Sequence, residues 1–166
     1  RHHRSHPLHM IRPGGHGNPM SLKKTQKIIA HRGGVVDQRR SENSLAALEE
    51  AIRRQYSHVE IDARITADGH VVCFHNDNLM EEAGVDARIS EMPLKDVTGT
   101  RLLRSDETIP TFDSYCARCS GRIGVMVDLK GCAEAHIDTY TREIVAALEK
   151  HELLGTALIL TNKTPV

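Results

Sequence analysis

The sequence predicts an α/β protein built on a parallel sheet, and three observations lead to this prediction. Short apolar runs typical of strands alternate with segments of helical periodicity. The first strand, the helix after it and the second strand form a βαβ unit, whose crossover makes the two strands parallel. Three strands end in polar or charged residues, which is where a parallel-sheet enzyme places its site.

The first strand is expected at residues 27–30, and its apolar run ends abruptly in His31-Arg32-Gly33-Gly34. The two glycines let the backbone approach a ligand closely. The Arg32 guanidinium can hold two phosphate oxygens, and the His31 imidazole can exchange a proton near neutral pH. The alternative is a loop histidine beside a surface arginine, which this short motif does not exclude.

An amphipathic helix of about three turns should follow this loop. Cap residues occupy positions 41–44, and apolar side chains recur at spacings of three and four at Leu45, Leu48, Ile52 and Tyr56. This helix links the first strand to the stretch at 58–75, which is predicted to be a hairpin.

The hairpin prediction depends on Asp68-Gly69, a dipeptide typical of two-residue turns. This turn would pair Ala67 with His70, Ile65 with Val72, and Asp62 with His75. Alternation along the strands would then place Glu60, Asp62 and His75 on one face. The opposite face would carry the apolar side chains of Ile61, Ala63, Ile65, Val72 and Phe74.

Two carboxylates on one strand face suit a hard divalent cation, and an imidazole beside them can transfer protons. The alternative is a solvated strand face that carries charges by chance. A further strand at 123–130 ends in Asp128 and Lys130, which alternation places on the same face. Charges at buried strand ends are costly unless they are paired or used, so three such ends favour a functional site.

The rest of the chain consists of two irregular segments and of helices and a strand without candidate site residues. Residues 1–22 are rich in His, Gly and Pro without periodicity, and we expect a disordered tail. The domain would occupy residues 23–166, with 76–111 as an insertion or lid that carries a short helix near 93–97. A short helix at 112–119, a helix from about 137 to 148 and a strand at 157–162 complete the expected elements.

Composition argues against several partners. The 22 basic residues balance the 22 acidic ones, and the chain lacks Trp, so nucleic-acid binding is not expected. No apolar run is long enough to cross a bilayer. Four cysteines without a disulfide framework indicate a reducing compartment, which we take to be the cytoplasm. Cys116 and Cys119 have ligand-like spacing, but no second pair completes a zinc site.

Taken together, these motifs resemble the glycerophosphodiester phosphodiesterase family of (β/α)8 barrels, from about Lys27 to the end of the chain. The resemblance is carried by His31-Arg32-Gly33, Glu42-Asn43, Glu60-Ile61-Asp62, Asp68-Gly69, His75, Ile109-Pro110-Thr111 and Asp128-Leu129-Lys130. It implies hydrolysis of a small glycerophosphodiester to glycerol 3-phosphate and an alcohol, with a divalent cation.

The resemblance also implies a role for each matched residue. His31 and His75 would be the acid and base pair, and Arg32 and Lys130 would bind the phosphate. Glu60, Asp62 and Asp128 would bind Mg²⁺ or Ca²⁺, with Glu42 in support. The chain departs from the family at Ser41 and Ser44, at Asn76 in place of an aspartate, and at Asp128 in place of a glutamate. An aspartate at that last position is similar to the related sphingomyelinase D group.

Length is the largest departure, because a barrel of this kind needs roughly 250 residues. We count four to five strands, which is the first half of a barrel. The chain is then a fragment, a half-barrel completed by another chain such as a second copy, or a partial sheet with altered function. The alternatives to a glycerophosphodiesterase are a sphingomyelinase D-like enzyme and a catalytically silent domain that binds phosphate or head groups.

Overall fold

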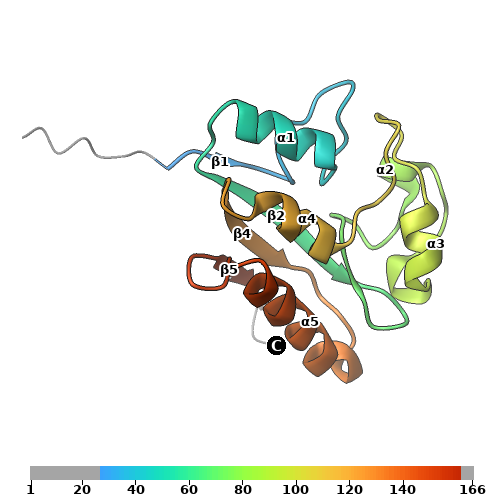
Figure 1. The fold of residues 1–166 in the computed structure, drawn as a ribbon. Helices are drawn as coiled ribbons and strands as arrows, with labels where there is room; N and C mark the ends of the chain where they lie inside the picture. The colour runs from blue at the N-terminus through green and yellow to red at the C-terminus, as the bar shows by residue number, and fades with distance from the viewer. Residues whose placement is uncertain (1–26, 162–166) are drawn as a thin grey trace, which may run out of the picture.

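A computed structural model describes residues 27–161 and contains one five-stranded sheet (Figure 1). The strands are β1 (Ile29–Ala30), β2 (His58–Ile65), β3 (Val71–Cys73), β4 (Gly124–Leu129) and β5 (Leu158–Thr161). Strands β1, β2, β4 and β5 are parallel neighbours in that order, and β3 pairs antiparallel with β2. The predicted parallel α/β architecture is confirmed, while the tail predicted at 1–22 lies outside the described residues.

The helices are α1 (Leu45–Arg53), α2 (Met80–Ala83), α3 (Leu94–Gly99), α4 (Phe112–Cys119) and α5 (Ile137–Lys150), with short 3₁₀ helices at Ile89–Glu91 and Glu134–His136. The four expected helices are present, whereas α2 and the two 3₁₀ helices were not predicted. Helix α1 begins where Ser44 Oγ accepts a hydrogen bond from the Ala47 N–H at 3.1 Å. This side-chain cap satisfies a backbone donor that the first helical turn leaves unpaired.

The main apolar core lies between the sheet and the layer of α1, α4 and α5, which cover the same face (Figure 1). It includes Leu48, Ile61, Tyr115, Val127 and Leu148, all of which are fully buried. The opposite sheet face carries the acidic side chains of β2 and β4. This division into an outer helical layer and an inner polar face is the arrangement of a partial (β/α)8 barrel.

The segment 76–111 contains α2 and α3 and has an apolar core of its own. That second core is formed by Val72, Phe74, Leu79, Ala83, Ile89, Val97, Leu102 and Ile109. Leu79, Ile89 and Val97 are completely buried. The segment is therefore packed against the far side of the hairpin, beside the main layers of the sheet (Figure 1).

The predicted hairpin register is wrong by one residue. Strand β2 pairs with β3 through Ala63 and Cys73, Arg64 and Val72, and Ile65 and Val71, so neither Ile65–Val72 nor Asp62–His75 is a pair. The Thr66 N–H donates to the His70 carbonyl at 2.8 Å, which leaves a three-residue loop in place of the predicted two. Val72 and Phe74 consequently point into the second core, away from Ile61, Ala63 and Ile65.

The cysteine pair on α4 does not have the chemistry of a ligand or redox pair. Cys116 and Cys119 are both buried in the main core. Burial raises the pKa of Cys116 to about 12 and raises that of Cys119 further. Because the thiolate is the reactive and metal-binding form, these thiols are inert packing groups at neutral pH.

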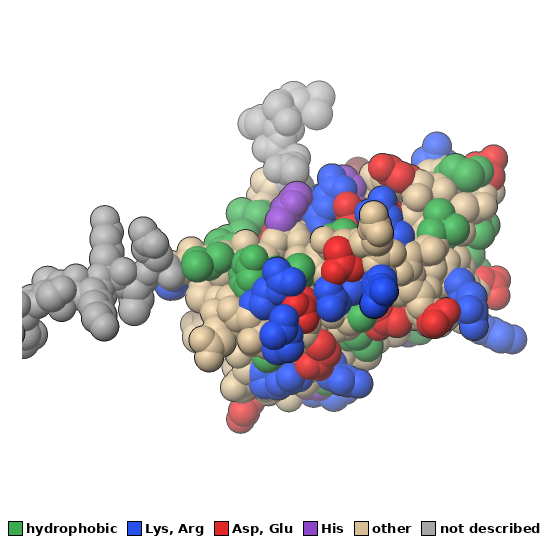
Figure 2. Space-filling model, turned by 90° about the horizontal axis from the view of Figure 1, so that it is seen from above, with side chains coloured by type: hydrophobic (Ala, Val, Ile, Leu, Met, Phe, Trp, Pro, Cys, Tyr) green, Lys and Arg blue, Asp and Glu red, His purple; other side chains and the backbone are tan. Residues whose placement is uncertain are grey.

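The sheet ends in open edges within the described residues, since β1 and β5 each have one neighbour. Leu158, Ile159 and Leu160 on β5 are 42%, 46% and 42% exposed. The surface that Figure 2 shows, on the side of α1, is polar by contrast. Basic and acidic side chains are mixed on it, and neither charge forms a separate patch. Across residues 27–161, none of the helices has the length and apolarity needed to cross a membrane.

Candidate metal and catalytic site

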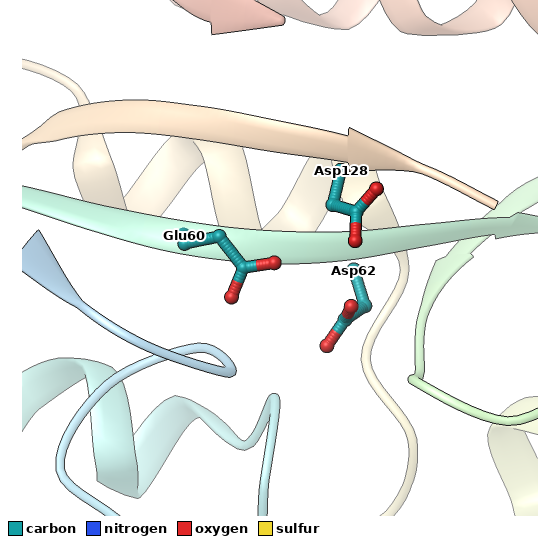
Figure 3. A group of neighbouring side chains, drawn as sticks. All are labelled: Glu60, Asp62 and Asp128. Carbon is teal, nitrogen blue, oxygen red and sulfur yellow. The ribbon is translucent and has the colours of Figure 1, made fainter. Parts of the chain in front are cut away.

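Three carboxylates from two neighbouring strands converge on the inner face of the sheet (Figure 3). Asp62 on β2 pairs directly with Asp128 on β4, and alternation places Glu60 on the same face as Asp62. One oxygen from each of Glu60, Asp62 and Asp128 lies within 4.8 Å of the others. Their exposed fractions are only 5%, 1% and 9%, so three acids share a nearly dry site.

Lys130 partly balances this negative charge. Its Nζ lies 2.7 Å from Asp128 Oδ2 and 2.8 Å from Asp62 Oδ1. Burial acts to lower the pKa of Lys130, but its hydrogen bonds to Asp128 and Asp62 outweigh this effect and raise it. Burial, together with the nearby charge of Asp62, raises the pKa of Glu60. Three carboxyl groups therefore share one ammonium group.

The donor set fits a divalent cation. Carboxylate oxygens are the ligands that Mg²⁺ and Ca²⁺ prefer. Asp128 Oδ1 is buried and has no hydrogen-bond partner among residues 27–161. A buried acceptor without a partner is costly, and a bound cation would satisfy it.

The loop after β1 is held against Glu60 by its backbone. Arg32 has a positive φ of 51°, and its N–H donates to Glu60 Oε2 at 2.7 Å. A Cβ on Gly34 would lie 2.2 Å from the Ala47 carbonyl oxygen, so only glycine permits this approach to α1. The loop thereby brings His31 Nε2 to 3.9 Å from Glu60 Oε2, with a side chain that is 76% exposed.

Glu42 holds the Arg32 side chain. Arg32 Nη1 lies 2.5 Å from Glu42 Oε1, and this hydrogen bond is the main reason that the pKa of Arg32 is raised, against the effect of burial. Within the described part of the chain, Arg32 Nε makes no hydrogen bond. The guanidinium therefore keeps a donor for an anion while Glu42 fixes its orientation.

His75 does not share the predicted face with Glu60 and Asp62, because the Phe74 N–H donates to the Asp62 carbonyl in the shifted register. It follows β3, and its carbonyl accepts a hydrogen bond of 2.8 Å from Arg64 Nε. Its ring nitrogen Nδ1 lies 3.0 Å from Asn76 Oδ1. The other predicted residues, His31, Arg32, Glu42, Glu60, Asp62, Asp128 and Lys130, are linked by the contacts described above.

Two residues that support the site were missed in the sequence. Asn43 joins α1's cap segment to Asp62, and Arg64 joins β2 to the His75 segment. Arg64 could have been found, because alternation from Glu60 and Asp62 places it on the same face. Asn43 belongs to the Glu42-Asn43 motif, but its partner was not predicted, because the contact joins residues that are 19 positions apart.

A cavity of about 430 Å³ adjoins the carboxylates. It is lined by Ile29, His31, Glu60, Met126, Asp128, Leu160 and Thr161. An inner cavity of this kind, with convergent polar groups on one wall, can admit a small ligand beside the acidic cluster.

Comparisons with known proteins agree with this geometry. The model of the glycerophosphoryl diester phosphodiesterase family matches residues 31–152. Glycerophosphodiester phosphodiesterase 1 of Bos taurus is 32% identical over 114 residues, which cover 63% of this chain and 34% of that protein. The human protein of the same name is 31% identical over 123 residues, which cover 68% of this chain and 37% of that protein.

Solved structures give the same result. An Oleispira antarctica phosphodiesterase in complex with the product sn-glycerol-3-phosphate superposes with a TM-score of 0.74 at 28% identity, covering 84% of this chain and 58% of that chain. A glycerophosphodiester phosphodiesterase from Agrobacterium tumefaciens gives a TM-score of 0.70 at 22% identity, covering 83% and 58%. The chain thus spans about a third of the curated relatives and somewhat more than half of these structures.

Proposed function

Because this chain belongs to the glycerophosphoryl diester phosphodiesterase family, we propose that it hydrolyses a glycerophosphodiester to glycerol 3-phosphate and an alcohol. The observation that carries the proposal is the buried cluster of Glu60, Asp62 and Asp128 beside His31 and Arg32. We further propose that Mg²⁺ or Ca²⁺ binds to these three carboxylates. Since the chain covers only part of its relatives, its own activity is a proposal.

Charge neutralisation is the first requirement of the reaction. A phosphodiester carries a negative charge that repels nucleophiles, and a bound divalent cation supplies Lewis-acid stabilisation of that charge. Arg32 would donate to a second phosphate oxygen, held in place by Glu42. Lys130, between Asp62 and Asp128, would add positive charge at the same rim.

Proton transfer would fall to the two histidines. One imidazole would remove the proton from the attacking hydroxyl or water, and the other would donate a proton to the departing alkoxide. His31 is exposed at the rim and 3.9 Å from Glu60, so its ring can reach a ligand and still contact the acidic cluster. His75 is attached to β2 by Arg64 and would provide the second imidazole.

The direct test is hydrolysis of glycerophosphocholine with Mg²⁺ and, separately, with Ca²⁺, measured as release of glycerol 3-phosphate. We expect turnover that His31→Ala and Asp62→Asn remove. His70→Ala and Asp106→Asn are matched controls: His70 pairs with Glu143, and the Asp106 side chain is fully exposed. A folded preparation without turnover, or with turnover that survives Asp62→Asn, would contradict the proposal.

A second substrate and a binding measurement separate the alternatives. A sphingomyelinase D-like enzyme would act on a sphingomyelin or lysophospholipid substrate and not on glycerophosphocholine. A silent head-group-binding domain would bind glycerol 3-phosphate in calorimetry without turnover. Asn76 and the partial barrel favour this second alternative, because each removes something that the resemblance implies.

We also propose that residues 76–111 shape the substrate end of the site, and that the open edges of β1 and β5 are covered in the functional assembly. Three adjacent apolar side chains on β5 are more than 40% exposed, and an exposed strand edge tends to pair with another strand. A second copy of the chain is the occupant we favour. Sedimentation velocity should then show a dimer, and a monomer at all concentrations would contradict it.

A further inference from the structure

His75 is connected through Asn76 to a carboxylate on a different element. His75 Nδ1 lies 3.0 Å from Asn76 Oδ1, and Asn76 Nδ2 lies 2.7 Å from Glu81 Oε2. Glu81 is in the first turn of α2. Three side chains therefore form a continuous hydrogen-bonded line from the imidazole to an acid that the proposed reaction does not use.

The direction of each hydrogen bond follows from the carboxylate. A glutamate carboxylate only accepts hydrogen bonds, so the group of Asn76 that faces Glu81 must be its NH₂. The Asn76 oxygen is then the group that faces His75. Because that oxygen also only accepts, His75 Nδ1 must carry a proton, which leaves Nε2 as the unprotonated nitrogen of the neutral ring.

We infer that Asn76 and Glu81 are positioning residues that hold His75 in the tautomer with a proton on Nδ1 and a lone pair on Nε2. The inference rests on the proposed function to the extent that His75 acts there as a base or acid. The role of Glu81 is to fix the orientation of the Asn76 amide, which could otherwise rotate and present NH₂ to the imidazole. A rotated amide would favour the opposite tautomer, in which Nε2 carries the proton and cannot accept another.

The main chain around the line is fixed on both sides. Arg64 Nε donates to the His75 carbonyl at 2.8 Å, which attaches this segment to β2. Asp77 Oδ1 accepts from the Ser90 N–H at 3.0 Å, and the Asp77 carbonyl accepts from the Ile89 N–H at 2.9 Å. With the backbone held, the remaining freedom of His75 is the rotation and tautomer of its ring, which Asn76 and Glu81 control.

The first measurement is the tautomer of His75, read from its ring ¹⁵N chemical shifts at mildly alkaline pH. We expect a protonated Nδ1 in the wild-type chain and a mixture of tautomers in Glu81→Ala. Glu91→Ala is the matched control, since Glu91 is an exposed acid of the same segment. A wild-type ring protonated on Nε2, or a Glu81→Ala ring unchanged from the wild type, would overturn the inference.

The second measurement exchanges the amide and the carboxylate between positions 76 and 81. In Asn76→Asp alone, the new carboxylate faces that of Glu81. In Asn76→Asp combined with Glu81→Gln, the new carboxylate accepts hydrogen bonds both from His75 and from the glutamine amide. We expect Glu81→Ala to lower kcat by roughly three- to tenfold with little change in KM, a small part of what a general base contributes. Asn76→Asp keeps an acceptor against His75 Nδ1, so it should keep the wild-type tautomer and lose less activity than Glu81→Ala. The exchange variant should recover most of the loss.

A purely structural role for Glu81 would lower the melting temperature without moving the tautomer, and the exchange would not restore kcat. That outcome would overturn the inference. The two proposals also fail separately. A wild-type chain without turnover contradicts the proposed function, while the ¹⁵N shifts still decide whether Glu81 sets the His75 tautomer.

Discussion

Asn43 and Asp62 hold each other by two hydrogen bonds. Asn43 Nδ2 donates to Asp62 Oδ2 at 2.9 Å, and the Asp62 N–H donates to Asn43 Oδ1 at 3.1 Å. Both residues are 1% exposed, and Asn43 has a positive φ of 55°. One side chain therefore orients a candidate metal ligand and pairs its backbone while occupying a left-handed conformation that asparagine tolerates.

Replacing Asn43 should destabilise the fold and disturb the carboxylate. In Asn43→Gly the backbone conformation remains accessible, but two buried Asp62 groups lose their partners, at a cost of about 1–3 kcal/mol for each unsatisfied group. Asn43→Ala should be worse by about 1 kcal/mol, because a Cβ is unfavourable at positive φ. Chemical denaturation of the two variants separates these effects. Equal stabilities for Asn43→Gly and the wild type would contradict the assigned role.

Divalent cations should stabilise the wild-type chain through Glu60, Asp62 and Asp128. Binding to the folded state alone adds about 2.7 kcal/mol when the cation is at one hundred times its dissociation constant. We expect Mg²⁺ or Ca²⁺ to raise the melting temperature, and EDTA to reverse the effect. Asp62→Asn should lose most of the shift, because it removes a charged ligand.

Asp106→Asn is the control for that titration, since the Asp106 side chain is fully exposed and is not part of the cluster of Glu60, Asp62 and Asp128. It should respond to the cation as the wild type does. An equal shift in Asp62→Asn would mean that the cation binds elsewhere on the protein.

The sequence was sufficient for the fold and for most of the candidate site because the relevant signals are local. Apolar runs that end in charges located β1, β2 and β4, and alternation correctly placed Asp128 and Lys130 on one face. The hairpin register failed because Asp68 does more than turn the chain. Its carboxylate accepts from Thr66 Oγ1 at 2.6 Å and from the Leu94 N–H at 2.9 Å, so the loop widens to meet α3. Such a tertiary contact has no signal in a dipeptide.

Tyr115 supports the His31–Gly34 loop from within the core. Its hydroxyl donates to the Gly33 carbonyl, and the side chain is completely buried. Tyr115→Phe leaves that carbonyl without its partner, so we expect a loss of about 1–3 kcal/mol in the free energy of unfolding. Tyr56→Phe is the control, because Tyr56 is a half-buried tyrosine beyond the end of α1. Equal losses of unfolding free energy in the two variants would show that the hydrogen bond to the Gly33 carbonyl does not stabilise the fold.

Glu50 should make part of the stability depend on pH in the acidic range. Its carboxylate accepts hydrogen bonds from Arg53 and then Arg54, which lower its pKa from 4.5 to about 2. Because the pKa in the folded state lies below that in the unfolded state, the stabilisation is complete above pH 4.5. It is lost as the pH falls towards 2. The difference in unfolding free energy between the wild type and Glu50→Gln should therefore shrink across this window. Glu91→Gln, at an exposed acid, should show no such trend, and a constant difference for Glu50→Gln would contradict the assignment.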